Sequence, residues 1–202
     1  MNWLAHVLLS EADTEFRLGN LLADVVKGKA RAGMSVGFLR GVRCHQAIDA
    51  FTDFHPIVHR SRARVAPPLR RYAGILVDIF YDHYLARDWT RYASIPLDAF
   101  TAEVYQSFRS CTCSLPAEAE IVLQRIIAED RLGSYRELGG IETALTRLSG
   151  YLSGRWRRPI ELQRGIADMV EHDGAFTRDF AEFFPLLVEH VNCRRQVPHG
   201  FA

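Results

Sequence analysis

The chain has 202 residues, of which 48% are hydrophobic and 24% are charged, and this balance excludes disordered and collagen-like proteins. The formal net charge of +1 excludes a strong overall electrostatic field but leaves room for local basic patches. No apolar run reaches the roughly 18 residues of a membrane span, and residues 1–10 lack the features of a signal peptide, so we expect a cytoplasmic protein without membrane insertion.

Apolar residues recur at three- and four-residue spacing along the chain, and no stretch alternates as a β-strand between hairpin signals would. This pattern predicts an all-α fold. We see no linker and no internal repeat, so we expect residues 1–202 to form a single compact domain of many helices. The predicted helices cover residues 3–9, 20–26, 36–54, 57–65, 69–92, 97–111, 117–129, 135–138, 141–156 and 160–192, the last with a break near Asp173-Gly174.

Several predicted helix ends carry residues that favour a start or a stop. Ser35 can cap the helix that follows it, and Pro56 ends that helix. The pair Pro67-Pro68 is expected to open the long central helix. Ser134 and Glu137 have the spacing of a capping box, which predicts a helix that begins after Ser134.

The first two predicted helices place polar residues among core residues. His6 lies in an apolar segment, where a single histidine is usually a core residue with hydrogen-bonded nitrogens. Asn20 and Asp24 stand four residues apart in the next helix, where Asn20 taken alone would be explained as an N-cap.

The helix predicted at residues 36–54 places His45, Asp49 and Asp53 along one stripe. A histidine and an aspartate four residues apart can be a simple intrahelical pair that stabilises the helix by roughly 0.2–0.5 kcal/mol. The spacing leaves this explanation open beside a functional one.

The central predicted helix carries Asp78, Asp82 and His83 within a run that is apolar on almost every side. Asp78 and Asp82 are about one turn apart and face the same way. Such a helix is normally buried, and an ionised carboxylate in an apolar interior must be paired, hydrogen-bonded or bound to a metal. Arginine partners and a metal ion are therefore the two explanations.

Acids and imidazoles thus occur on four different apolar helices, which indicates that they converge in the fold. A cluster of oxygen and imidazole ligands suits manganese, magnesium or iron(II), and the four cysteines show no paired CxxC spacing that would indicate a thiolate site. Such a centre serves metal-assisted hydrolysis, in which the ion activates a water and arginines hold the phosphate oxygens.

Short motifs follow one another over most of the chain: Met1-Asn2-Trp3-Leu4-Ala5-His6, Gly19-Asn20-Leu21-Leu22-Ala23-Asp24, His45-x-x-Ile48-Asp49-x-x-Thr52-Asp53, Asp78-x-x-x-Asp82-His83-x-Leu85 and Phe183-Phe184-Pro185. They resemble the motifs of the acyl carrier protein phosphodiesterase family. The resemblance implies a divergent HD phosphohydrolase fold and a manganese-dependent enzyme. It implies hydrolysis of the phosphodiester between 4′-phosphopantetheine and a serine of acyl carrier protein, giving apo-acyl carrier protein and 4′-phosphopantetheine.

The resemblance also implies roles for the polar residues. The implied metal ligands are Asp24, His45, Asp78, Asp82 and His83. The residues implied to orient those ligands or to move protons are His6, Asn20, Asp49 and Asp53. The superfamily usually carries an adjacent His-Asp pair, whereas here His45 and Asp49 are one helical turn apart. The dipeptide His172-Asp173 is adjacent, but we interpret it as a surface helix end.

The partner implied by the resemblance is a small acidic helical protein, and we expect neither nucleic acid nor membrane as a partner. A basic cluster that includes an aromatic side chain is a common interface composition and can orient an acidic partner. The expected docking residues are Arg155, Trp156, Arg157 and Arg158. Two alternatives stay open: an HD-type phosphohydrolase that acts on nucleotides or other small phosphate esters, and a non-catalytic helical binding module.

Overall fold

The computed structural model describes residues 1–196 and Phe201, and these residues contain no β-strand, which confirms the predicted all-α class. The α-helices are α1 (Trp3–Leu8), α2 (Thr14–Leu22), α3 (Val36–Phe54), α4 (Pro56–Arg62), α5 (Ala73–Arg87), α6 (Leu97–Ser110), α7 (Ala117–Ala128), α8 (Arg131–Ser134), α9 (Leu138–Trp156), α10 (Ile166–Glu171) and α11 (Asp173–Gln196). The 3-10 helices are η1 (Gly28–Gly33), η2 (Pro67–Tyr72), η3 (Trp89–Arg91) and η4 (Leu162–Gly165). Among the described residues, no helix combines the length and the apolarity needed to cross a bilayer.

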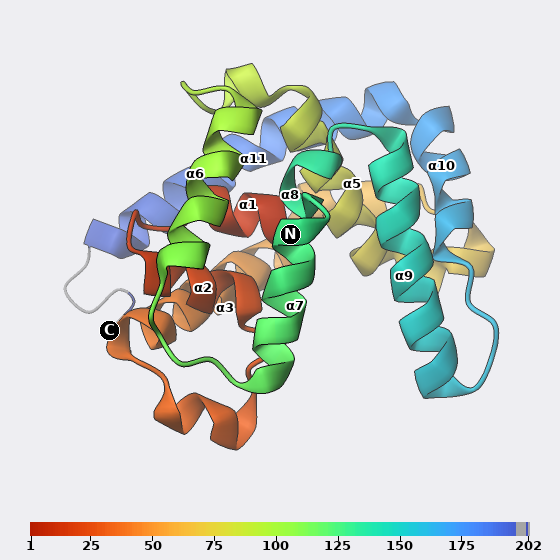
Figure 1. The fold of residues 1–202 in the computed structure, drawn as a ribbon. Coiled ribbons are helices and arrows are strands. Elements are labelled where there is room, and N and C mark those ends of the chain that lie inside the picture. The colour runs from red at the N-terminus through yellow and green to blue at the C-terminus, as the bar shows by residue number, and fades with distance from the viewer. Residues whose placement is uncertain (197–200, 202) are drawn as a thin grey trace.

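Helix α5 is enclosed by other helices. It contacts α1, α4, α9 and α11, and α11 runs across the back of the molecule (Figure 1). The side chains of Phe80, Tyr81 and Tyr84 are fully buried. Phe176 of α11 meets Phe80 edge-on with ring centroids 5.7 Å apart, and Phe180 meets Tyr81 at 5.3 Å. A helix that is apolar on almost every side is therefore covered on almost every side.

Helices α2 and α3 pack closely because each presents a glycine to the other. A methyl group added at Gly19 would lie 1.9 Å from the carbonyl oxygen of Phe38, and one at Gly41 would lie 2.0 Å from that of Phe16. Only glycine allows the two backbones to come this near. The close packing brings the residues after Gly19 next to the middle of α3.

Two predicted boundaries are confirmed. Helix α3 spans Val36–Phe54, as predicted, and the side chain of Ser35 accepts a hydrogen bond from the backbone N–H of Phe38 at 3.1 Å. The break predicted near Asp173 is present, because α10 ends at Glu171 and α11 begins at Asp173.

Other boundaries were predicted wrongly. The helix expected from residue 20 begins instead at Thr14, because the carboxylate of Asp13 accepts a hydrogen bond from the N–H of Phe16 at 2.7 Å and caps it. Asn20 is therefore an interior residue of α2. The single helix expected over residues 69–92 is divided into η2, α5 and η3.

The capping box expected at Ser134 does not form. The hydroxyl of Ser134 donates to the carbonyl oxygen of Arg131 at 2.9 Å, inside α8. Asp130 caps that helix by accepting a hydrogen bond from Gly133, so the helical turn lies four residues earlier than predicted. Helix α9 then begins after Glu137, whose side chain makes no capping bond.

Candidate metal centre

Two histidines and an aspartate from two helices meet at one point. His6 of α1 and His45 and Asp49 of α3, hereafter the triad, offer ligand atoms that all lie within 4.8 Å of one another. The two imidazole rings stack with centroids 4.1 Å apart. The Nε2 atoms of His6 and His45 lie 3.1 and 3.0 Å from the two oxygens of Asp49. Both imidazoles are buried, whereas Asp49 is partly exposed, so the triad opens to solvent through its carboxylate.

Asn20 orients both imidazoles. Its side-chain amide donates to the carbonyl oxygen of His6 at 2.8 Å, so its Oδ1 atom is an acceptor, and the Nδ1 atom of His6 donates to it at 2.9 Å. Nδ1 of His45 donates to the main-chain oxygen of Asn20 at 2.8 Å. In each ring, therefore, Nδ1 donates its hydrogen to an oxygen of Asn20, and Nε2 points toward Asp49. Metal-binding histidines are held in this way.

Ser10 completes the support of Asn20. Its hydroxyl donates to the carbonyl oxygen of His6 at 2.8 Å and accepts from the Asn20 amide at 2.9 Å. No sequence pattern indicated Ser10, because a serine just after a short helix stands outside any helical periodicity.

Asp24 lies at the open side of the triad. Its carboxylate is 3.6 Å from Nε2 of His45 and 3.1 Å from the ammonium group of Lys27, and its side chain is 74% exposed. The contact with His45 lowers the pKa of this carboxyl most, burial raises it, and the contact with Lys27 lowers it further. The net result is a pKa well below the usual range. Asp24 is thus an ionised group that solvent reaches freely.

Burial and the nearby carboxylates give the two histidines different charge states. Burial, and then the charge of His45, lowers the pKa of His6 to about 4. Burial also lowers the pKa of His45, but Asp24 and Asp49 outweigh it and raise the value to about 9. Burial raises the pKa of Asp49 while the two histidines lower it, with a net shift downward. At neutral pH the triad thus combines a neutral imidazole, an imidazolium and a carboxylate.

The triad has the donor set of a divalent-metal site. Nε2 of His45 is buried and forms no hydrogen bond with a described residue, although an oxygen of Asp49 lies 3.0 Å away. Two imidazole nitrogens and a carboxylate oxygen are ligands that first-row divalent ions accept. An ion would replace the proton of His45 at the place where two carboxylates favour positive charge.

Asp78 lies next to the triad without belonging to it. Its carboxylate is 3.1 Å from the amino group of Met1, which is also 3.6 Å from Asp49. Burial raises the pKa of Asp78, although the positive amino group opposes the shift. The amino group therefore stands between Asp78 and Asp49.

Asp82 supports the backbone of α1. It is fully buried and accepts hydrogen bonds from the N–H groups of Leu4, at 2.7 Å, and Ala5, at 3.2 Å. Burial raises the pKa of Asp82 to about 7, although these two bonds lower it. In this arrangement Asp82 fixes the helix that carries His6 and does not reach the triad as a ligand.

The structure does not bring His83 or Asp53 to the triad. Nδ1 of His83 donates to the carbonyl oxygen of Tyr135 at 2.8 Å. Asp53 is exposed and pairs with Arg62 at 2.6 Å. In the dipeptide His172-Asp173, His172 follows the end of α10 and Asp173 is the first residue of α11, where it pairs with an arginine at 2.8 Å.

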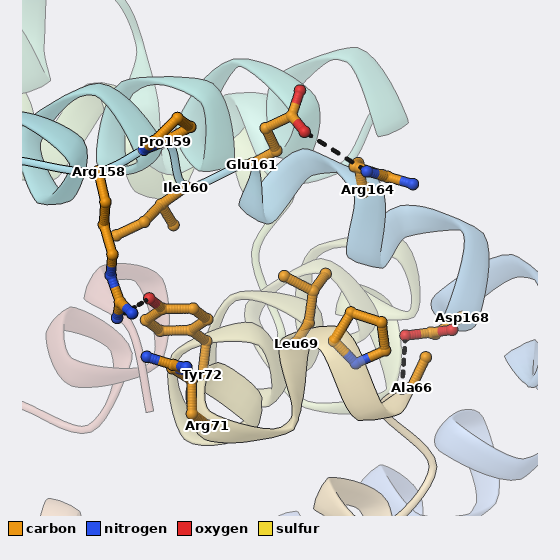
Figure 2. A pocket seen from close by; sticks show the side chains of 11 residues that line it. Ala66, Leu69, Arg71, Tyr72, Arg158, Pro159, Ile160, Glu161, Arg164 and Asp168 are labelled. Atoms are coloured by element: carbon orange, nitrogen blue, oxygen red, sulfur yellow. Dashed lines mark hydrogen bonds and ion pairs between the residues drawn. The ribbon is translucent and has the colours of Figure 1, made fainter.

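Arg158, the last residue of the arginine cluster at the end of α9, lines a cavity of about 340 Å³ together with Arg71 and Tyr72 (Figure 2). The guanidinium of Arg158 donates to the hydroxyl of Tyr72 at 2.9 Å, and Trp156 stacks on the same ring with centroids 5.9 Å apart. The guanidinium of Arg71 lies over the Tyr72 ring, 5.6 Å from its centroid. Neither Arg71 nor Arg158 forms an ion pair with a described residue. Arg155, Arg158 and the left-handed Arg157 are all exposed.

A second cavity, of about 350 Å³, has a mostly apolar lining. We name it the α9 cavity, because α9 forms one of its walls. Asp24 also lines it. The carboxylate that lies 3.6 Å from Nε2 of His45 is therefore also part of the wall of the α9 cavity.

The model of the acyl carrier protein phosphodiesterase family matches residues 1–187. The chain is 29% identical to the acyl carrier protein phosphodiesterase of Pectobacterium atrosepticum over 192 residues, which cover 94% of this chain and 96% of the relative. It is 28% identical to the Photorhabdus laumondii protein of the same name over 190 residues, 94% of each chain. For a third protein of that name, from Escherichia coli, the identity is 28% over 195 residues, 95% of this chain and 98% of the relative.

No solved structure matches the chain. The resemblance to the HD phosphohydrolase fold therefore stays a prediction.

Proposed function

Because the chain belongs to the acyl carrier protein phosphodiesterase family, we propose that it hydrolyses the phosphodiester that joins 4′-phosphopantetheine to a serine of holo-acyl carrier protein. The products are apo-acyl carrier protein and 4′-phosphopantetheine. The observation that carries this proposal is the triad of His6, His45 and Asp49, a divalent-metal donor set in a chain that matches the family over residues 1–187.

His6, His45 and Asp49 would hold the ion in this proposal. Manganese is the expected metal, and iron(II) and magnesium have compatible ligand preferences; the two imidazoles favour manganese or iron over magnesium. When bound, the ion supplies an activated water and draws charge from a phosphoryl oxygen. Asp78 and Asp82 are not ligands in this proposal. Asp78 holds the amino group of Met1, and Asp82 holds the backbone of α1, which carries His6.

Asp24 is the residue we expect to act on the attacking water. Its carboxylate is ionised, exposed and 3.6 Å from Nε2 of His45, so it can accept a hydrogen bond from a water at the open side of the triad. Lys27, 3.1 Å from Asp24, brings positive charge to the same side, where the phosphodiester is negative.

The acidic carrier protein would dock on the basic patch formed by Arg71, Arg155, Trp156, Arg157 and Arg158. Arg71 and Arg158 lack carboxylate partners among the described residues, so they are available to an acidic surface. Tyr72, which contacts Arg158 and Trp156 of this patch, ends η2 directly before α5, and Asp78 lies in the second turn of α5. The start of α5 therefore connects the patch to Asp78, whose carboxylate shares the amino group of Met1 with Asp49 of the triad.

The reaction is tested by incubating the purified protein with manganese and holo-acyl carrier protein and weighing the carrier by mass spectrometry. We expect the carrier to lose the mass of the prosthetic group. Asp49→Ala should abolish the loss, and the exposed Asp98→Ala on α6 should not. An unchanged carrier mass after incubation with metal-loaded protein would reject the proposed reaction.

A further inference from the structure

We propose that the α9 cavity binds the pantetheine arm of the substrate while the phosphodiester lies at the triad. This inference rests on the proposed function and adds to it the place where the non-reacting part of the substrate is held. The cavity has about 350 Å³, within the range of roughly 300–1,000 Å³ that is usual for small-molecule sites.

The position of the cavity supports this assignment. Asp24 forms part of the cavity wall and also lies 3.6 Å from Nε2 of His45. A phosphodiester at the triad carries the serine on one side of phosphorus and the pantetheine arm on the other. Asp24 lines the α9 cavity, so an arm that leaves the phosphate past this residue can enter it.

The chemistry of the lining matches the arm. Pantetheine alternates apolar segments, including a carbon with two methyl groups, with two amides. The apolar part of the lining includes Trp3, Ile79 and Leu148, from α1, α5 and α9. Apolar walls with a few placed polar groups are typical of ligand sites.

Two arginines supply the polar groups. Arg131 and Arg147 line the cavity, and both contact the same oxygen of Glu129, at 2.9 and 2.7 Å. A guanidinium has five N–H donors, so one shared carboxylate leaves donors on both for the amide oxygens of the arm. The Arg131 guanidinium also lies over the Trp3 ring, 5.6 Å from its centroid, which holds it at the cavity wall.

The test is a substitution on α9 that places a larger side chain in the cavity. Ala144 is partly buried and lines the cavity, whereas Glu142 on the same helix is exposed and does not. We expect Ala144→Trp to lower kcat/KM for holo-acyl carrier protein at least tenfold and Glu142→Trp to leave it within twofold of the wild type. Thermal melting and manganese content, measured for both variants, establish that the fold and the triad are retained.

A binding measurement makes the result independent of turnover. Pantetheine itself, titrated into metal-free protein by calorimetry, should bind the wild type and Glu142→Trp alike and Ala144→Trp at least fivefold more weakly. Arg147→Gln, which changes no core residue, should also weaken the binding of pantetheine. If Ala144→Trp does not fold, this variant tests the assignment of the cavity.

The two proposals can fail separately. Equal pantetheine affinity in the wild type, Ala144→Trp and Arg147→Gln would overturn the assignment of the cavity, whatever the catalytic result. A wild-type protein that binds pantetheine in the cavity but leaves holo-acyl carrier protein intact would overturn the proposed reaction and support the arm site.

Discussion

At the scale of single residues, Asn20 controls the geometry of the candidate metal centre. Its side-chain oxygen fixes His6 and its main-chain oxygen fixes His45, so one buried residue sets the tautomer of both imidazoles. A substitution at this residue removes the support of His6 while the main-chain support of His45 remains.

We predict that Asn20→Ala binds manganese about 10- to 100-fold more weakly than the wild type, because His6 loses the acceptor that orients its ring. The free energy of unfolding should also fall by about 1–3 kcal/mol, since the amide contacts inside the core are lost. Calorimetric titration with manganese and urea denaturation measure the two effects. Asn192→Ala, at an exposed residue of α11, is the control, and equal manganese affinity in both variants would contradict the role of Asn20.

The charge of His45 predicts how stability depends on pH. In the metal-free protein the pKa of His45, which faces Asp24, Asp49 and the neutral His6, is raised from 6.5 to about 9. A raised histidine pKa means that the folded state binds the proton more tightly than the unfolded state. The stabilisation is therefore complete below pH 6.5 and is lost as the pH rises through 9.

We predict that the free energy of unfolding of the metal-free protein falls by about 3 kcal/mol across this interval and that Asp49→Asn flattens the fall. Urea denaturation in the presence of a chelator, repeated at several pH values, gives the comparison. Asp98→Asn should keep the wild-type slope, because Asp98 is exposed and pairs with Arg136 far from His45 in the sequence. A wild-type slope in Asp49→Asn would show that the contact between His45 and Asp49 does not govern this pH dependence.

At the scale of helices, the contact between α2 and α3 positions the triad and its support. The glycines at this contact let the backbones approach, and the approach brings the main-chain oxygen of Asn20 to His45. Part of this arrangement could be predicted: the bounds of α3 and its capping by Ser35 follow from local sequence. The start of α2 could not, because the cap at Asp13 precedes the apolar pattern that defined the predicted helix.

We predict that Gly41→Ala destabilises the fold by about 3 kcal/mol, because the new methyl group would lie 2.0 Å from the carbonyl oxygen of Phe16. The matched control is Gly150→Ala in α9, where no atom lies within 4 Å of the added carbon. That substitution should stabilise the helix by roughly 0.5–1 kcal/mol. Chemical denaturation of both variants provides the test, and equal midpoints would contradict the close packing.

At the scale of the whole molecule, the chain brings together residues that are far apart in sequence. Helical spacing could place His45 and Asp49 on one face, but it could not show which neighbour that face meets. Asp82 is an example: its burial was predictable, whereas its bonds to the start of α1 depend on how α1 and α5 pack. The cytoplasmic location and the exclusion of nucleic acid stay predictions.

The basic patch gives a prediction at this scale. We predict that Arg158→Glu raises KM for holo-acyl carrier protein about tenfold, because it places a carboxylate where an acidic partner is expected. The wild-type KM should itself rise with salt concentration, and that rise should be smaller in the variant. Arg109→Glu, an exposed residue of α6, makes the same charge change elsewhere and should not affect KM. Equal KM values for the two variants would remove the patch from the docking surface.

The bonds from Asp82 to α1 also determine when, during synthesis, a metal centre can exist. All three triad residues lie within the first 49 residues of the chain, and α1 has only six residues, too few to be stable alone. Its N–H groups are held by a carboxylate that the ribosome adds more than thirty residues after Asp49. A nascent chain that already contains every ligand therefore has no ordered site for the ion until α5 has emerged and packed against α1.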